Sequence, residues 1–274
     1  MKIRTILAGL VTGVVALAAA GCSSSTTTTS SESITIGIKF DQPGLGLKTA
    51  DTYTGFDVEV AKYVAKELGY ASDKITYKET PSAQRESMIS SGQVKLIFAT
   101  YSITDARKAT VSFAGPYFIA GQDLLVRADN TDITGPEALN GKKLCSVSGS
   151  TSAQKIKDKY ATGVDLQNFD TYSKCVTALA AGTIDAVTTD NTILAGFAAQ
   201  DQYKGKFKVV GKPFSSERYG VGLKKGDTEL CGKVNTALKK MVDSGAWATA
   251  LSSTLGASGF TAPAGNPPAT DACS

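Results

Sequence analysis

The sequence predicts an α/β fold made of two lobes with parallel-rich sheets. Short β-type runs alternate with helical patterns in a β-α-β-α-β order, and this order occurs twice along the chain. Two extended segments connect the repeats, which predicts two crossings between the lobes. At 274 residues, 42% hydrophobic and 20% charged, the chain is long and apolar enough for two modest domains.

The first repeat starts with alternating apolar residues at Ile34–Ile38, a pattern typical of a strand. A helix is expected over Phe56–Leu68, because apolar residues recur at helical spacing and Gly69 follows as a stop. The remaining elements expected in this repeat are a strand at Ile75–Tyr77, a short helix at Ser82–Ser90 and a buried strand at Val94–Ala99.

The second repeat has the same order. Its expected elements are a strand at Lys143–Val147, a helix at Ser152–Tyr160 capped by Ser150 or Thr151, a strand at Val164–Phe169, a helix at Tyr172–Ala181 and a strand at Ile184–Thr188. The crossings are expected at Gln122–Arg127 and near Phe214–Leu223. A long amphipathic helix around Leu230–Val242 and a loop-like tail from Thr261 complete the chain.

The N-terminal region has the features of a secretory signal. Lys2 and Arg4 precede a short apolar run, and Ala19-Ala20-Gly21-Cys22 resembles a bacterial lipobox with alanine where leucine is more usual. We therefore expect residues 1–21 to be a signal peptide and Cys22 to carry lipid. Residues 22–32 are rich in Ser and Thr and predict a flexible tether. An uncleaved membrane anchor is the alternative for the first segment.

The other four cysteines, in a chain expected to be exported, predict two disulfides. Three pairings are possible. We predict Cys145–Cys175, because both fall in the second repeat, and Cys231–Cys273, because this bridge would fix a tail with little apolar surface.

The composition excludes several classes of function. The chain has no histidine, so it has neither a Ser-His-Asp site nor a His-ligated metal, and no metal or cofactor is expected. A net charge of +4 without a dense basic run argues against nucleic-acid binding. The segment Gly135–Lys143 lacks phosphate-loop spacing, and Ser152-Ala153-Gln154-Lys155 matches the SxxK motif of serine enzymes without its partner motifs in the required order.

Five blocks carry a resemblance to a known family. They are Gly55–Ala61, Ser102–Arg107, Val111–Phe118, Gly149–Thr151 and Ala180–Ala186. In this order they resemble the polar amino-acid binding proteins of ABC importers, solute-binding family 3, from about Ser33 to about Leu255. The resemblance implies a type II periplasmic-binding-protein fold with a two-strand hinge. It implies an amino acid held between lobe 1 (33–124 plus 220–274) and lobe 2 (125–219).

The resemblance also implies site residues. Arg107 matches the arginine that binds the α-carboxylate, and a guanidinium suits this role because it donates two parallel hydrogen bonds. Asp190 matches the aspartate that receives the α-ammonium. Thr100, Ser102, Ser150 and Thr151 fall where hydroxyl or backbone groups contact the ligand, and Thr151 also starts a helix. Tyr172 is expected to line the second lobe.

Lys39, Ser82 and Arg85 are expected to form the side-chain pocket. The first strand and Lys39 look like those of actinobacterial-type glutamate-binding lipoproteins. Because an unpaired buried cation is costly, a ligand with two carboxylates fits best. The sequence therefore predicts a lipid-anchored, extracytoplasmic and monomeric binding protein for L-glutamate, with L-aspartate as a further candidate, that serves an ABC permease. The alternatives are a cyclohexadienyl-type dehydratase, a binding protein for a neutral amino acid such as glutamine, and a sensory ligand domain.

Overall fold

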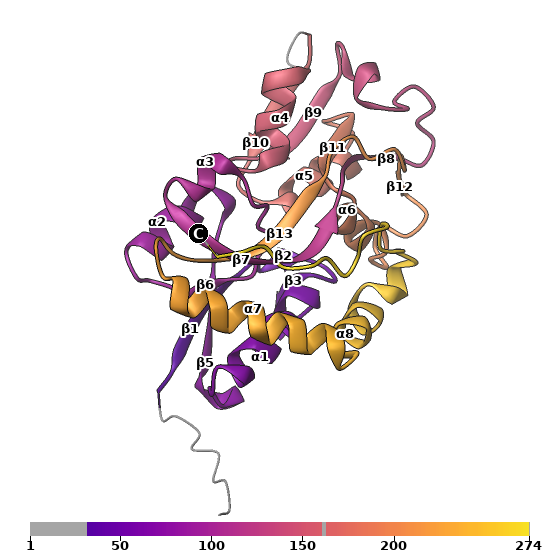
Figure 1. Ribbon diagram of the computed structural model, residues 1–274. Coiled ribbons are helices and arrows are strands. Elements are labelled where there is room, and N and C mark those ends of the chain that lie inside the picture. The colour runs from indigo at the N-terminus through magenta and orange to yellow at the C-terminus, as the bar shows by residue number, and fades with distance from the viewer. Residues whose placement is uncertain (1–31, 161–162, 274) are drawn as a thin grey trace, which may run out of the picture.

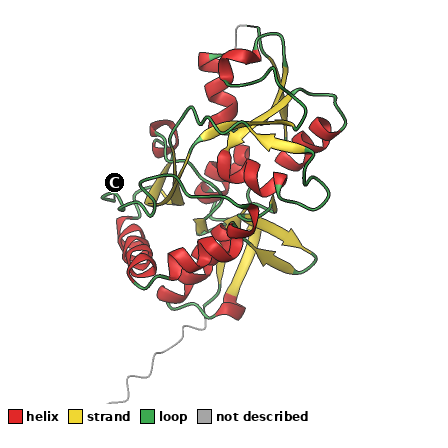
Figure 2. Cartoon of the chain, turned by 90° about the vertical axis from the view of Figure 1, so that its right-hand side faces the viewer, coloured by secondary structure: helices red, strands yellow, loops and turns green. Residues whose placement is uncertain are grey.

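The computed structural model describes residues 32–160 and 163–273, and these residues form two lobes, each built on a five-stranded sheet (Figure 1). The predicted signal peptide, the lipidation of Cys22 and nearly all of the tether lie outside the described residues. Helices pack on both faces of the sheets (Figure 2), as expected for alternating strands and helices. Within the described part of the chain, no helix combines the length and the apolar character needed to cross a membrane.

The first sheet has the strand order β5-β1-β6-β13-β7. β1 pairs in parallel with both β5 and β6, whereas β13 runs antiparallel to β6 and β7. The strands are β1 (Ile34–Ile38), β5 (Ile75–Glu79), β6 (Leu96–Ile97), β7 (Val111–Ala120) and β13 (Glu217–Lys224). The helices of this lobe are α1 (Phe56–Glu67), α2 (Arg85–Ser90), α3 (Asp105–Lys108), α7 (Thr228–Asp243) and α8 (Ala246–Thr254).

The second sheet has the order β10-β9-β11-β8-β12. Its parallel core is β9 with β10 and β11, and β8 is antiparallel to β11 and β12. The strands are β8 (Gln122–Arg127), β9 (Lys143–Val147), β10 (Asp165–Phe169), β11 (Ala186–Asp190) and β12 (Phe207–Val209). The helices are α4 (Thr151–Lys159), α5 (Tyr172–Ala180) and α6 (Asn191–Ala198).

Smaller elements complete the fold. A three-stranded sheet of β2 (Asp41–Gln42), β3 (Gly46–Thr49) and β4 (Thr52–Thr54) lies between β1 and α1 in the chain. Single 3-10 turns occur at Ser72–Lys74, Ser82–Gln84, Pro136–Leu139 and Gly256–Ser258. Neither the small sheet nor α3, α6, α8, β7 and β12 were predicted from the sequence, and the predicted strand Val94–Ala99 pairs only at Leu96–Ile97.

The chain passes between the sheets twice, in each case just before the strand that was predicted from the sequence as the crossing or as its main part. β7 ends at Ala120 in the first sheet and β8 begins at Gln122 in the second. The return runs from β12 to β13 through residues 210–216. The two crossings touch, because a Cβ at Gly121 would lie 2.7 Å from Pro213 and 3.0 Å from Ser215 O. The two-lobed α/β prediction is therefore confirmed, while the exact lobe boundaries stay a proposal.

Two disulfides join the predicted partners. Cys145 on β9 is bonded to Cys175 on α5, and Cys231 on α7 is bonded to Cys273 in the tail. The tail has no helix or strand over 261–273, as predicted, but it is held to the edge strand β7. Asn266 bonds both the amide and the carbonyl of Ile119, and Asp271 N–H donates to Gly115 O.

Candidate functional site

A small buried cavity lies between the lobes, where loops that follow the strands of both sheets meet. Such positions, beyond the carboxyl ends of parallel strands, are where open α/β sheets bind ligands. The first lobe contributes cations and hydroxyls, and the second contributes hydroxyls and a carboxylate. The lining residues are Gln42, Ser82, Arg85, Thr100, Arg107, Ser150, Thr151, Ser152, Tyr172, Thr189, Asp190 and Ile193.

The cavity has a free volume of only about 10 Å³, and about 10–15 Å³ is what a single water molecule requires. An amino acid therefore enters only if the lobes or the lining side chains move. A larger groove of about 550 Å³ opens beside the cavity and shares Arg107, Ser150 and Thr151 with it. The larger groove therefore leads to the end of the cavity where Arg107 lies.

Arg85 and Arg107 place two guanidinium groups on the first-lobe side. Their Cζ atoms lie 5.0 and 4.9 Å from the centre of the Tyr101 ring, in cation–π contact. Burial and the neighbouring Arg107 charge lower the pKa of Arg85, and Arg85 Nε is buried without a hydrogen-bond partner among the described residues. An anion at this position would relieve both effects.

Arg107 also spans the gap between the lobes. It donates to Ser102 O at 2.8 Å in its own lobe and to Gly149 O at 3.1 Å in the other lobe. Its Nε lies 3.4 Å from Glu86 Oε1. Gly149 has a φ of +77°, and a Cβ there would lie 2.6 Å from the Cα of Ala83. The absence of a side chain at Gly149 therefore allows the lobes to approach this closely.

Thr100 is held in an uncommon backbone conformation at the cavity wall. Its φ of +47° is in the left-handed region, which costs a threonine about 1–3 kcal/mol. Its N–H donates to Asp57 Oδ2 at 2.8 Å, and Tyr117 Oη donates to Asp57 Oδ1 at 2.7 Å. Burial raises the pKa of Asp57 to about 6, against the opposing effect of these hydrogen bonds. Asp57 at the start of α1 thus positions a cavity residue.

The start of α4 forms part of the second-lobe side. Ser150 is the N-cap of this helix and accepts from Ala153 N–H at 3.0 Å, and Thr151 is its first residue. First-turn N–H groups and the helix dipole favour an anion here. Tyr172, the first residue of α5, is also buried in the cavity wall, and burial raises the pKa of its hydroxyl.

Asp190 ends β11 and occupies the N-cap position of α6, without a hydrogen bond from its side chain to the helix. Its Oδ2 accepts from Tyr219 Oη at 2.7 Å, while its Oδ1 is buried without a hydrogen-bond partner in the described part of the chain. Burial first, and then repulsion from Glu217, raise the pKa of Asp190 to about 7. Glu217 itself pairs with Lys155 at 3.0 Å. The free oxygen of Asp190 is available to a cationic group in the cavity.

Eight of the ten predicted ligand contacts line the cavity, and two do not. Lys39 is fully buried, but its Nζ lies 3.4 Å from Asp41 Oδ1, without hydrogen-bond geometry, and burial lowers its pKa. Ser102 is buried behind Arg107, to which its carbonyl is bonded. The eight lining residues are Ser82, Arg85, Thr100, Arg107, Ser150, Thr151, Tyr172 and Asp190.

Sequence reasoning missed four lining residues: Gln42, Ser152, Thr189 and Ile193. Ser152 and Thr189 are neighbours of predicted residues, so the same helix start and strand end indicate them. Gln42 lies in the small sheet, for which the sequence has no signal, and its Nε2 is buried without a hydrogen-bond partner among the described residues. No group of three metal-ligating side chains occurs in residues 32–160 and 163–273.

Two α/β lobes, two crossings and a polar cavity between them define a two-lobed solute-binding protein. A family match identifies the particular family: residues 34–256 match the bacterial extracellular solute-binding proteins, family 3. The chain belongs to this family, and it is a binding protein and not an enzyme.

Similar proteins agree with this assignment. The glutamate-binding protein GluB of Corynebacterium glutamicum is 45% identical over 97% of this chain and 94% of its own length. The glutamate-binding protein GluB of Corynebacterium efficiens is 48% identical over 82% of this chain and 79% of its own length. Among solved structures, an ancestral arginine-binding protein bound to glutamine is similar with a TM-score of 0.76 and 35% identity, over 82% of this chain and 98% of that one.

Proposed function

We propose that this protein captures L-glutamate between its lobes for an ABC amino-acid importer. L-aspartate is proposed as an alternative ligand of the same site. The observation that carries the proposal is the buried pair Arg85 and Arg107, where Arg85 Nε has no hydrogen-bond partner among residues 32–160 and 163–273. The charged lining residues are these two cations and Asp190, a sum of +2 − 1 = +1. Glutamate, with a charge of −1, would neutralise that sum, and the similarity to two glutamate-binding proteins supports the same ligand.

Each polar end of glutamate has matching groups in the cavity. In this proposal, Arg107 and the first-turn N–H groups at Thr151 bind the α-carboxylate, and the free Oδ1 of Asp190 receives the α-ammonium. Arg85 and Ser82 bind the side-chain carboxylate, with Lys39 behind them. Thr100, Ser150 and Tyr172 shape the wall, and Ser102 holds Arg107.

Glutamine is the second candidate, and one observation favours it. Lys39 is paired with Asp41, so its charge is already offset and does not require an anionic ligand. The choice between the two ligands then depends on Arg85 alone. The solved relative named above was obtained with glutamine bound.

The proposal extends to the cellular setting. A signal peptide at residues 1–21, lipid on Cys22 and a tether over residues 22–32 would hold a monomer at the outer face of the cell membrane. The lobes would follow the expected bounds, 33–124 plus 220–274 and 125–219, to within a few residues, because β8 begins in the second sheet at Gln122 and β13 begins in the first sheet at Glu217. Mass spectrometry of the membrane-extracted protein tests the anchor, because lipid on Cys22 adds a defined mass.

Calorimetric titration of the purified chain with the twenty common amino acids tests the ligand. Glutamate is expected to bind most tightly, aspartate next, and glutamine at least about ten-fold more weakly, since one charge-assisted hydrogen bond separates them. Tighter binding of glutamine or of a basic amino acid would overturn the assignment.

A further inference from the structure

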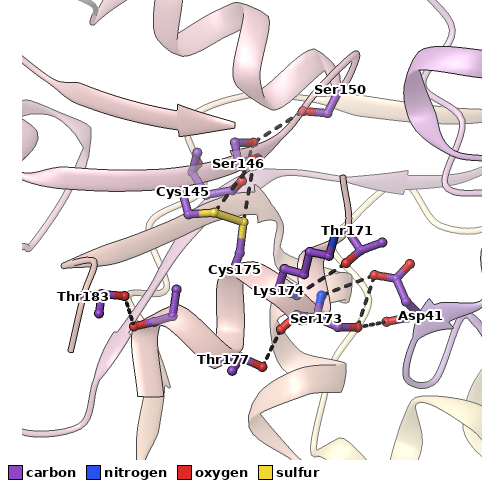
Figure 3. Close-up of a disulfide and its surroundings, with 12 residues drawn as sticks. Asp41, Cys145, Ser146, Ser150, Thr171, Ser173, Lys174, Cys175, Thr177 and Thr183 are labelled. Carbon is purple, nitrogen blue, oxygen red and sulfur yellow. Dashed lines mark hydrogen bonds between the residues drawn. A yellow bond between two sulfur atoms is a disulfide. The ribbon is translucent and has the colours of Figure 1, made fainter. Parts of the chain in front are cut away.

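Asp41, in the small sheet of the first lobe, makes a direct contact with helix α5 of the second lobe. Ser173 N–H donates to Asp41 Oδ2 at 3.3 Å. Ser173 Oγ lies 3.3 Å from the same oxygen and 3.4 Å from the Asp41 carbonyl oxygen. Figure 3 shows the two residues facing each other. They are 132 positions apart, and they meet because β2 of the first lobe lies against α5 of the second.

The contact has the chemistry of a helix cap that comes from the other lobe. Thr171 is the N-cap of α5, so Ser173 lies in the first turn, where N–H groups have no partner within the helix. A carboxylate at this position is stabilised by the hydrogen bond and by the helix dipole. Lys39, 3.4 Å from Asp41 Oδ1, holds the other side of the carboxylate. Separating the lobes would return both partners to water.

The helix that carries Ser173 is fixed to its own sheet by a disulfide. Cys175, two residues after Ser173, is bonded to Cys145 on β9, and both sulfur atoms lie within 3.8 Å of Ser146 O (Figure 3). Tyr172, which lines the cavity, precedes Ser173. The bridge therefore fixes one turn that serves both the cavity and the contact between the lobes.

We propose that Asp41 and Ser173 form a latch that stabilises the closed arrangement of the lobes, and that the Cys145–Cys175 disulfide braces its second-lobe half. The latch is a positioning device, because neither residue lines the cavity. It acts on the lifetime of the closed complex, since a ligand that enters separated lobes meets no such contact, whereas release from the closed complex must break it. It rests on the proposed function only through the choice of ligand used to detect closure.

Ser173→Ala tests the latch, with Thr177→Ala as the matched control. Thr177 is exposed one turn further along α5, and its hydroxyl bonds within the helix to Ser173 O. The probe is L-glutamate in stopped-flow fluorescence. If the wild type does not bind it, which would refute the proposed ligand alone, the probe is the tightest ligand of the twenty-amino-acid titration. We expect about 3–10-fold faster dissociation for Ser173→Ala, with an unchanged association rate.

Thr177→Ala should dissociate like the wild type. Asp41→Asn should dissociate faster as well, because it weakens the bonds that Asp41 accepts from both the Ser173 N–H and the Ser173 hydroxyl, whereas Ser173→Ala removes only the second. Combining the two changes should therefore have less than the sum of their separate effects. Dissociation of both Ser173→Ala and Asp41→Asn at the wild-type rate would overturn the latch, since Ser173→Ala keeps the bond from the backbone N–H. So would fully additive effects of the two changes, since residues that act through one contact are coupled.

Comparing the two disulfides tests whether the Cys145–Cys175 bridge stabilises the latch. Cys145→Ala/Cys175→Ala and Cys231→Ala/Cys273→Ala open loops of similar length, with separations of 30 and 42 residues, so both should lower the melting temperature to a similar extent. Only the first pair should speed ligand dissociation. If a variant does not fold, mild reduction with thiol alkylation to quantify each bridge gives the same comparison. Equal effects of the two bridges on dissociation would overturn the brace.

Discussion

The two lobes contribute different chemistry to the same cavity. The first lobe supplies Arg85 and Arg107, which are already stacked on Tyr101 before any ligand contact is needed. The second lobe supplies the starts of α4 and α6, with Asp190 at the latter. The first lobe thus offers fixed positive charge, while the second offers helix ends and a carboxylate that titrates near neutral pH. We therefore expect selection of the ligand's charge to depend on the first lobe, and recognition of its α-carboxylate and α-ammonium to need both lobes.

The largest loss of ligand affinity is expected when Arg107, the residue that bridges the lobes, is replaced. Arg107→Ala should weaken binding of every amino acid, because the α-carboxylate is common to all. Loss of a buried charged partner costs about 2–5 kcal/mol, or roughly 30- to 5,000-fold in affinity. Calorimetry with glutamate, aspartate and glutamine measures it. Near-normal affinity for all three would show that the α-carboxylate binds elsewhere.

Asp190→Asn should have the next largest effect. It removes the counter-charge of the ammonium but keeps the shape of the side chain, so we expect a loss of about 1.5–3 kcal/mol, or roughly 10- to 150-fold. Glutarate, which has both carboxylates and no ammonium, is the control ligand and should lose far less. Equal losses of affinity for glutamate and glutarate would show that Asp190 does not bind the ammonium.

The sequence predicted the architecture well because the fold depends on patterns that are local. Apolar alternation at Ile34–Ile38 and the capping serine before α4 are visible within a few residues. The disulfides could also be predicted, because each joins residues of one lobe. The small sheet was missed, since Asp41–Gln42 and Thr52–Thr54 are too short to show a period.

The site was predictable where it follows motifs and not where it depends on the approach of the lobes. Arg107 belongs to one of the five blocks, Asp190 ends the strand that follows the block Ala180–Ala186, and both line the cavity. Lys39 has the sequence position of a ligand contact, but its direction is decided by Asp41, and the contact of Asp41 with Ser173 is visible only in three dimensions. The position of a cation in the sequence does not show which carboxylate neutralises it.

Substitutions of Arg85 and Lys39 test which buried cation of the first lobe distinguishes glutamate from glutamine. Arg85→Gln should reduce the glutamate-over-glutamine affinity ratio by roughly ten-fold or more, because it removes a charge-assisted hydrogen bond that only glutamate uses. Lys39→Gln should change the ratio less, since Asp41 already pairs with Lys39. Paired titrations of both amino acids measure the ratios. A larger change in the ratio for Lys39→Gln would show that Lys39 recognises the side-chain carboxylate of the ligand. An unchanged ratio in both variants would refute the proposal that the pocket selects an acidic side chain.

The smallest expected effect is a pH dependence that arises from the second lobe. Burial and Glu217 raise the pKa of Asp190 to about 7, so the carboxyl is partly protonated in the ligand-free protein at neutral pH. A bound ammonium favours the ionised form, and binding therefore releases a proton. Glutamate affinity should fall by about three-fold from pH 7.5 to 6.5, where the ligand's own carboxylates, with pKa values of about 4 or lower, do not titrate.

The same group has the opposite effect on folding. Because the pKa of Asp190 is higher in the folded than in the unfolded chain, the folded state binds more protons between about pH 4 and 7, and the ligand-free protein should gain stability as the pH falls through this window. Asp57, with a pKa of about 6, adds to this gain at the lower end. Thermal unfolding and calorimetry over the same pH series measure the two trends. Asp190→Asn should abolish the slope in affinity and reduce the slope in stability, whereas a slope in affinity that persists would place the titrating group outside Asp190.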